Sequence, residues 1–162
     1  MYTTTKDFRT FSDAAVYMDY GYSIIDTTML EHDGTIYRFT KDERSNTPTT
    51  PNGKFVFQEA GDSIFDPTFE MIREGIGKGS ISRGEGPTAF KSNTEDRWYL
   101  FIDEFGGRGY VPFETTDLAS GNWSVPADYD LPSRPRHGTV VPVTLTEYNR
   151  LRACVNPAAC WR

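Results

Sequence analysis

The sequence predicts an all-β fold of the propeller kind, and three observations lead to this prediction. Helical patterning is weak along the 162 residues, while 14 Gly and 10 Pro separate short runs rich in aromatic and β-branched residues. One long segment occurs twice, and a shorter outer-hairpin pattern occurs three times. Units of about four strands that repeat favour a radial arrangement over a β-sandwich, which is the alternative for short strands at this spacing.

The long repeat covers residues 23–39 and residues 82–101. Asp26 in the first copy and Glu85 in the second take the same place, and each is followed by a turn and a closing strand. Glycine and proline around Glu85 make its surroundings too rigid for a helix, so the carboxylate is expected at a strand end. In a radial fold both acids would lie on innermost strands and point toward one axis.

The shorter pattern places an Asp-containing turn beside an aromatic residue, at residues 4–11, 59–69 and 114–123. Its three copies predict about three blades. Residues 139–144 are typical of an inner strand. The fold is therefore expected to be closed by N- and C-terminal strands in one sheet.

Residues 1–153 are expected to form a single domain, because a chain of this length supports one sizeable core. Within it, the polar run at residues 42–52 is predicted to be a surface loop and residues 146–153 a short helix capped by threonine. Three aromatics on the closing strand of the second repeat are assigned to the core: Trp98, Tyr99 and Phe101.

Composition narrows the class of partner. A net charge of -6 argues against nucleic acid, whose binding needs clustered Lys and Arg. No apolar run approaches the roughly 20 residues of a membrane helix, and the N-terminus lacks the pattern of a signal peptide. The protein is expected to be soluble, and cytoplasmic unless a leader precedes this sequence. Cys154 and Cys160 lie in a short tail, residues 154–162, where a local disulfide and two free thiols are both open.

Convergent carboxylates are what glycosidic bond hydrolysis requires, since one acid protonates the leaving oxygen and one base acts on water or on the sugar. A carboxyl group crowded by a second carboxylate and by apolar walls has a raised pKa, which would suit Glu85 to the acid role. The alternative is that Asp26 and Glu85 cap strands or bind turn amides.

Three segments, IDTTMLEHDGTIYRFTKDE, the run from SRGEGPTAF to ASGNW, and RHGTVVPVT, resemble glycoside hydrolase family 43. That family comprises five-bladed propellers that act on arabinose- and xylose-containing glycans with inversion. The resemblance therefore implies a partial five-bladed propeller as the alternative to about three blades. The resemblance implies that Glu85 is the general acid and that Asp26 tunes and orients it. It also implies that His137 lies near the axis, where the family's histidine contacts a metal or water cluster, so Ca²⁺ could bind there although no cofactor is required.

The general base is missing from its expected place, because the family carries it on an inner strand ahead of anything present here. Asp19, Asp103 and Glu104 are the nearest candidates, each with an ordinary surface or turn role as the alternative. A second copy could also supply the base, so a homo-oligomer is one expectation. A non-catalytic carbohydrate-binding remnant, or a fragment of a larger glycosidase, is the alternative function.

Four further residues are candidates for contact with a carbohydrate substrate. Arg83 could bind a sugar hydroxyl or hold Asp26 ionised, or it could pair with a surface carboxylate. Tyr22 and Phe105 lie near turns, where an aromatic ring can stack on a sugar. Arg108 lies in FGGRGY, which lacks the lysine and the following helix of a phosphate loop and is more typical of a tight turn.

Overall fold

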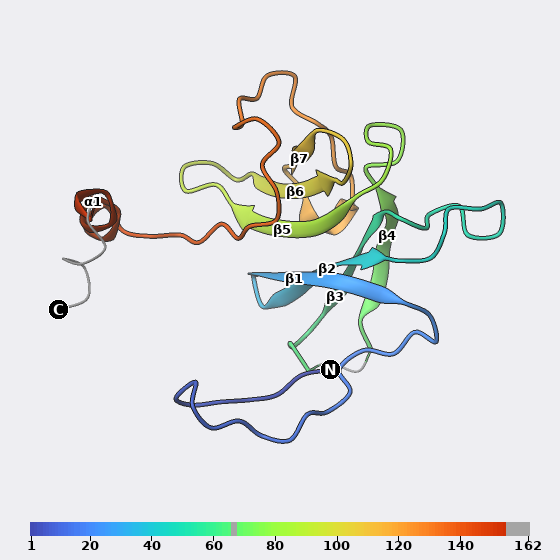
Figure 1. Ribbon diagram of the computed structural model, residues 1–162, viewed down its shortest axis with the longest axis horizontal. Helices are drawn as coiled ribbons and strands as arrows, with labels where there is room; N and C mark the ends of the chain where they lie inside the picture. Colours follow the sequence, from blue (N-terminus) through green and yellow to red (C-terminus); the bar gives the residue numbers. More distant parts are fainter. Residues whose placement is uncertain (66–67, 155–162) are drawn as a thin grey trace.

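The structure, a computed structural model, describes residues 1–65 and 68–154 and consists mainly of two antiparallel sheets. The first sheet has the order β1-β2-β3-β4 and the second the order β5-β6-β7 (Figure 1). The strands are β1 (Ile24–His32), β2 (Thr35–Asp42), β3 (Val56–Gly61), β4 (Glu70–Ile76), β5 (Glu85–Lys91), β6 (Trp98–Glu104) and β7 (Gly109–Thr115). The all-β prediction is confirmed.

Each sheet is a meander, and local sequence explains where its strands turn. Asp33 and Gly34 connect β1 to β2 with φ angles of 51° and 80°, the left-handed pair that two-residue hairpin turns require. On β6 the burial alternates, so Trp98 faces the core while Tyr99 and Phe101 are partly exposed on the opposite side. The core assignment is therefore confirmed for Trp98 and wrong for the other two.

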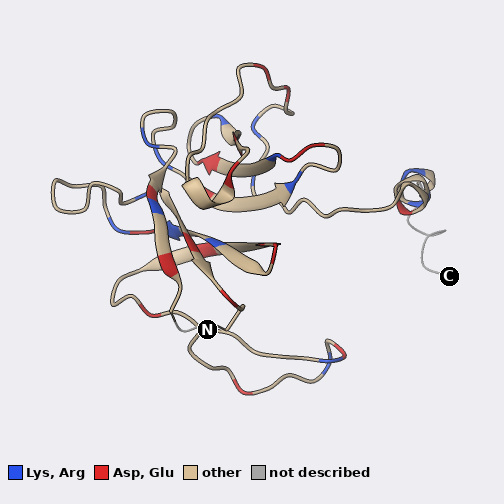
Figure 2. Ribbon diagram, turned by 180° about the vertical axis from the view of Figure 1, so that it is seen from behind, with Lys and Arg blue, Asp and Glu red and all other residues tan. Residues whose placement is uncertain are grey.

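The hydrophobic core lies between the two sheets. Phe39 and Val56 of the first sheet pack with Leu100, Val111 and Phe113 of the second, and all five are almost fully buried. Burying side chains of this size supplies roughly 1.5–3 kcal/mol each, which makes the inter-sheet contact the main source of stability. Acidic and basic residues are interspersed on the strands around this core (Figure 2).

A buried amide also joins the sheets. The Gln58 side chain on β3 donates to the backbone oxygen of Leu118 at 2.7 Å and accepts from the Trp123 indole at 2.8 Å. Leu118 begins a short 3-10 helix, η1 (Leu118–Ser120), which follows β7. Because both polar ends of a fully buried side chain are satisfied, this link holds the two sheets in one register.

β1 and β5 are the first strands of their sheets and contact one another, as expected of innermost strands.

The predicted number of about three blades is too high, since residues 1–65 and 68–154 form two sheets. Closure by terminal strands is also wrong. Among the described residues before β1, the β pairing is limited to an isolated bridge between Tyr2 and Ala15, and residues 139–144 form no strand. The short pattern at residues 4–11 forms a turn. The Asp7 side chain accepts hydrogen bonds from backbone amides of this turn, so they need no partner strand.

The predicted loop and helix are both present, with shifted boundaries: Asp42 is a buried residue of β2, and the helix begins one residue earlier than predicted. Residues 43–55 connect β2 to β3, and α1 (Leu145–Ala153) is capped by Thr144 through a reciprocal capping box with Glu147. The helix has no buried residue and stands away from the sheets (Figure 1). Among the described residues, no helix is long and apolar enough to span a membrane. Cys154 is disulfide-bonded, whereas Cys160 lies outside the described residues.

Candidate functional site

Glu85, Asp103 and Tyr110 form one row across the second sheet. Glu85 begins β5 and pairs with Asp103 on β6, which in turn pairs with Tyr110 on β7. Residues that pair directly across antiparallel strands project from the same face, so two carboxylates are neighbours at this end of the sheet. Like charges in this arrangement repel unless positive groups lie between them, and the surrounding segments supply such groups.

Three basic side chains contact the Glu85 carboxylate. Lys41 Nζ lies 2.9 Å from Oε2, while Arg136 Nη2 and His137 Nε2 lie 3.3 and 3.4 Å from Oε1. The Glu85 side chain is 16% exposed, so it is mostly enclosed yet still reaches solvent. The second carboxylate expected beside Glu85 is present as Asp103, but a cage of basic side chains takes the place of the expected apolar walls.

Asp103 is bound by two of the three residues that contact Glu85, Arg136 and His137. Its Oδ2 accepts from Arg136 Nε at 2.8 Å and lies 3.4 Å from His137 Nδ1. Its Oδ1 has no hydrogen-bond partner among the described residues, and the side chain is fully buried. A carboxylate without access to water is poorly placed to activate a water molecule, so Asp103 is better suited to fixing Arg136 and His137.

Lys41 enters the site from the first sheet. It pairs with Ile25 on β1 and with Val56 on β3, a row that corresponds to Glu85, Asp103 and Tyr110 in the second sheet. Burial works to lower the pKa of Lys41, but hydrogen bonds to Glu43 and Glu85 raise it overall. The lysine is therefore a buried cation that joins the two sheets at the site. The repeat carried a signal for it, because Lys41 stands where the second copy has Asp103.

Asp26 acts on the backbone beside Glu85. Both inner strands are bulged, β1 between Ile25 and Thr28 and β5 between Glu85 and Thr88. This register makes Asp26 equivalent to Gly86, with φ angles of 52° and 54°, and corrects the predicted equivalence of Asp26 with Glu85 by one residue. A bulge changes the direction in which the following side chain points, so the sequence pattern alone gave the wrong equivalent for Asp26. The Asp26 carboxylate accepts from the Gly86 N–H at 3.0 Å.

Arg83 and Phe105 lie together beside the site. The Arg83 guanidinium stacks on the Phe105 ring at 4.1 Å and donates to the Phe105 backbone oxygen at 3.0 Å. Lys41 Nζ lies 5.3 Å from the same ring, which places Phe105 at the edge of the Glu85 cage. These two candidates are near the site, and Arg83 makes no ion pair with a described residue.

The other candidates are engaged elsewhere. Arg44 stacks on the ring of Tyr22 at 3.7 Å. Arg108 binds Glu104 at 2.6 Å; burial works to raise the pKa of Glu104, but hydrogen bonds from Arg108 and the Ser82 N–H lower it overall. Asp19 accepts from the Gly21 N–H in a local turn. Within the described part of the chain, none of these three pairs contacts Glu85, so they do not belong to its cage.

The expected Ca²⁺ site was tested against the donors present. Glu85, Asp103 and His137 each offer an atom within 4.8 Å of the others. However, Lys41 and Arg136 already neutralise these carboxylates, and Ca²⁺ prefers a set of six to eight oxygen ligands. The described residues therefore do not fit a Ca²⁺ ion at this position.

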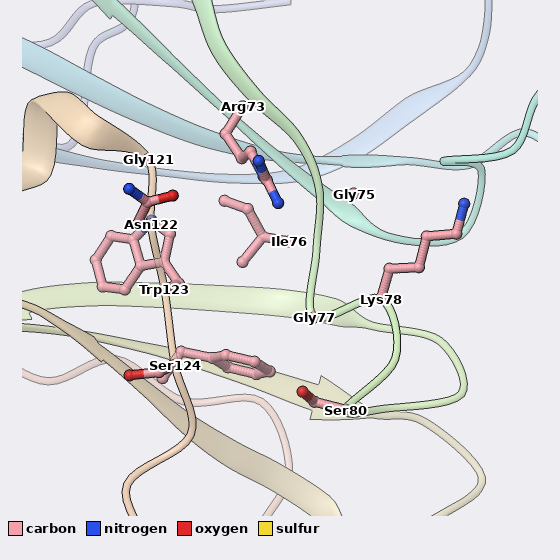
Figure 3. A pocket seen from close by; sticks show the side chains of 11 residues that line it. Arg73, Gly75, Ile76, Gly77, Lys78, Ser80, Gly121, Asn122, Trp123 and Ser124 are labelled. Atoms are coloured by element: carbon pink, nitrogen blue, oxygen red, sulfur yellow. The ribbon is translucent and has the colours of Figure 1, made fainter.

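Two hollows lie away from the carboxylates. One, of about 220 Å³, is lined by residues of the β4 end and of the segment after η1, including Arg73, Lys78 and Trp123 (Figure 3). The other, of about 780 Å³, lies along β1 and β5, where Met29 and Phe90 face the extended residues 140–143. The second is lined by the later residues of β1 and β5, and, among the described residues, neither hollow is lined by a residue of the Glu85 cage.

Comparison with known proteins identifies the family. Residues 1–149 match the sequence profile of the family described as a probable glycosyl hydrolase domain, related to glycoside hydrolase family 43. The chain belongs to this family. It is 30% identical, over an alignment of 144 residues, to an α-L-arabinofuranosidase of Bifidobacterium longum subsp. longum. The predicted resemblance to family 43 is confirmed.

The solved structure of an α-L-arabinofuranosidase from Clostridium thermocellum shares the fold with a TM-score of 0.52 at 19% identity, over 67% of this chain. This likeness supports a part of a propeller as the architecture. The chain spans 13% of the length of the Bifidobacterium relative and 36% of the Clostridium structure.

Proposed function

We propose that this glycosyl hydrolase domain contributes the general acid, Glu85, to the hydrolysis of arabinose- or xylose-containing glycans by an inverting mechanism. The observation that supports it is the position of Glu85, a partly open carboxylate at the end of an innermost strand, where β1 and β2 of the other sheet meet it. Family membership supports hydrolysis of glycosidic bonds, and the names of both relatives support arabinofuranosides as the substrates.

In this proposal Glu85 donates a proton to the glycosidic oxygen as the bond to the leaving group breaks. Arg136 and His137 contact Oε1, and Lys41 contacts Oε2, so these groups fix the carboxyl group and balance its charge once the proton has gone. Asp26 holds the adjacent backbone. Arg83 and Phe105, at the rim, are the groups that would contact the sugar.

None of the three predicted bases fits the remaining role. Asp103 is fully buried, Glu104 is paired with Arg108, and Asp19 binds a turn amide. Inversion also needs a separation of about 6.5–9.5 Å between the two carboxyl groups, whereas Glu85 and Asp103 are direct cross-strand neighbours. We therefore propose that another acid of this protein, or one from a partner copy, acts as the base.

The test compares Glu85→Gln with the matched carboxylate variant Glu95→Gln, because the Glu95 side chain is 59% exposed and pairs with Arg97 on the surface. Substrates are α-L-arabinofuranosides and β-xylosides that carry either a poor or a strongly activated leaving group. Glu85→Gln should slow cleavage of the poor leaving groups about 10²–10⁴-fold and spare the activated ones, which need no protonation. Unchanged turnover of every substrate by a folded Glu85→Gln protein would end the proposal.

A second function is sugar binding without hydrolysis. It is favoured by one observation: both oxygens of Glu85 are already engaged by basic groups. This function predicts saturable binding of xylo- or arabino-oligosaccharides, followed by calorimetry, with no new reducing ends after long incubation. Release of sugar by the purified protein would rule it out.

A further inference from the structure

Tyr110 makes contacts that connect otherwise separate parts of the site. It lies on β7 at the end of the row that begins with Glu85, and it is 8% exposed. Its phenol oxygen is 2.8 Å from the Gly86 carbonyl oxygen and 3.0 Å from that of Gly138, and it accepts from the Gly138 N–H at 2.8 Å. A hydroxyl has one proton, so it donates to one of the two carbonyls at a time.

The same residue holds both ends of the segment that carries the basic side chains. We call residues 135–138 the strap. The backbone N–H of Tyr110 donates to the Pro135 carbonyl at 2.8 Å, at one end, while its hydroxyl binds Gly138 at the other. Arg136 and His137 lie between these two points and reach Glu85 and Asp103.

The strap has little else to fix its position. It belongs to no strand or helix, and the Arg136 and His137 side chains are about half exposed. Charge attraction alone tolerates many side-chain orientations, whereas hydrogen bonds from a rigid strand define the backbone. The Tyr110 hydroxyl also contacts Gly86, the neighbour of Glu85, so it sets the strap relative to the acid.

We infer that Tyr110 is a positioning residue whose hydroxyl fixes Arg136 and His137 against Glu85 and Asp103. The contacts of its hydroxyl are with the backbone of Gly86 and Gly138, so Tyr110 acts through the strap. Its effect on catalysis rests on the proposed function, but its effect on the strap does not. The two can therefore be measured separately.

The experiment uses histidine side-chain NMR, because the protein has only two histidines, His32 and His137. His32 packs on Trp98 at 4.8 Å, in the β1–β2 hairpin, and is an internal control. Tyr110→Phe removes the hydroxyl and keeps the ring. The matched control is Tyr37→Phe, since Tyr37 is also 8% exposed but its hydroxyl binds no residue of the described ranges. Assignment comes from His137→Gln.

In Tyr110→Phe the imidazole signals of His137 should shift toward those of an unstructured histidine and broaden, while those of His32 stay in place. Tyr37→Phe should leave both unchanged. If hydrolysis is established, kcat should fall about 10- to 100-fold with little change in KM, as expected when catalytic groups are misplaced by about 1 Å. An absence of activity in the wild type would count against the proposed function and leave the NMR result valid.

Unmoved His137 signals in a folded Tyr110→Phe protein would overturn the inference. So would equal shifts at His32 and His137, which would indicate a general loss of packing. If Tyr110→Phe does not fold, Gly138→Pro removes the N–H that the hydroxyl accepts, at an exposed position with open space around it. That variant should move His137 in the same direction, and an unchanged spectrum would again contradict the role of the hydroxyl.

Discussion

The carboxylate of Asp26 accepts a hydrogen bond of 3.0 Å from the backbone N–H of Gly86. The inner strand of one sheet is thereby tied to the residue that follows Glu85 in the other. Both residues lie in bulges and have left-handed φ angles of 52° and 54°. Asp26 can thus influence Glu85 through the backbone, without contact between the two carboxylates.

Asp26 has two features that substitutions can separate: its carboxylate accepts a hydrogen bond from Gly86, and its backbone has a left-handed φ. Asp26→Ala removes the acceptor and places alanine at a left-handed φ, so it should lower the free energy of unfolding by roughly 2–3 kcal/mol. Asp26→Asn keeps an acceptor oxygen and tolerates this φ, so it should cost well under about 1 kcal/mol. Urea unfolding followed by tryptophan fluorescence measures both. Equal stability of the two variants would show that the hydrogen bond and the bulge do not matter.

Position 86 requires glycine for a second reason besides its left-handed φ, namely the lack of space for a Cβ. A Cβ at this position would collide with the His137 ring, including Nε2 at 2.7 Å, so Gly86→Ala should push the strap away from Glu85. Gly21→Ala is the matched control, because Gly21 has a φ of 70° and nothing within 4 Å of its Cβ position. Both variants should lose roughly 1–2 kcal/mol from backbone strain. Only Gly86→Ala should also shift the NMR signals of His137, and an unshifted His137 would contradict the contact.

These residues also show which features of the fold and the site could be predicted from the sequence. The strands, the β1–β2 turn and the acid at the head of β5 follow from local patterns: alternation, an Asp-Gly turn and a rigid Gly-Glu-Gly-Pro run. The one-residue offset between Asp26 and Glu85 did not follow, because a bulge is set by pairing with the neighbouring strand. Arg136 and Tyr110 were missed, since their roles depend on a strap that has no periodicity.

Closure of the fold was mispredicted for a related reason. Residues 139–144 have the β-branched composition of a strand, yet in the structure they run beside β5 with a single bond of 3.4 Å from the Val140 N–H to the Thr88 hydroxyl. Strand propensity describes a segment that fits a half-buried pleated surface, and it does not supply the partner strand.

Lys41 should stabilise the protein in a way that depends on pH. Its ammonium group lies 2.9 Å from Glu85 and 2.7 Å from Glu43, and it is almost fully buried. Hydrogen bonds from Lys41, and then from Lys54, hold the pKa of Glu43 below its ordinary 4.5. A carboxylate with a depressed pKa stabilises the fold above about pH 4.5, and this contribution is lost as the pH falls through the folded-state pKa.

Lys41→Met should therefore lower the free energy of unfolding by about 1–3 kcal/mol at pH 7, less than for a fully broken buried pair because Arg136 and Lys54 remain. The difference from wild type should shrink below pH 4.5. Lys91→Met, at a side chain that is 42% exposed, is the control and should change stability by less than about 1 kcal/mol. A deficit that is independent of pH would argue that Lys41 acts by packing alone.

Tyr20 gives a corresponding prediction at alkaline pH. Its phenol hydrogen-bonds to Glu59 and accepts from Arg38 at 2.9 Å, and burial, followed by the Glu59 interaction, raises its pKa from 10.0 to about 12. The unfolded chain therefore releases this proton at lower pH than the folded one. The stabilisation is present in full below pH 10 and is lost as the pH rises toward 12.

Tyr20→Phe should be less stable than wild type by roughly 1–2 kcal/mol at pH 7, because Glu59 loses a hydrogen-bond partner in a buried position. Between pH 10 and 12 the wild type should lose stability faster than the variant, so that their unfolding free energies converge. Denaturation at a series of pH values measures this, with Tyr2→Phe, at a 36% exposed side chain, as the control. Parallel curves for wild type and Tyr20→Phe would mean that Tyr20 ionises alike in the folded and unfolded protein, contrary to its contact with Glu59.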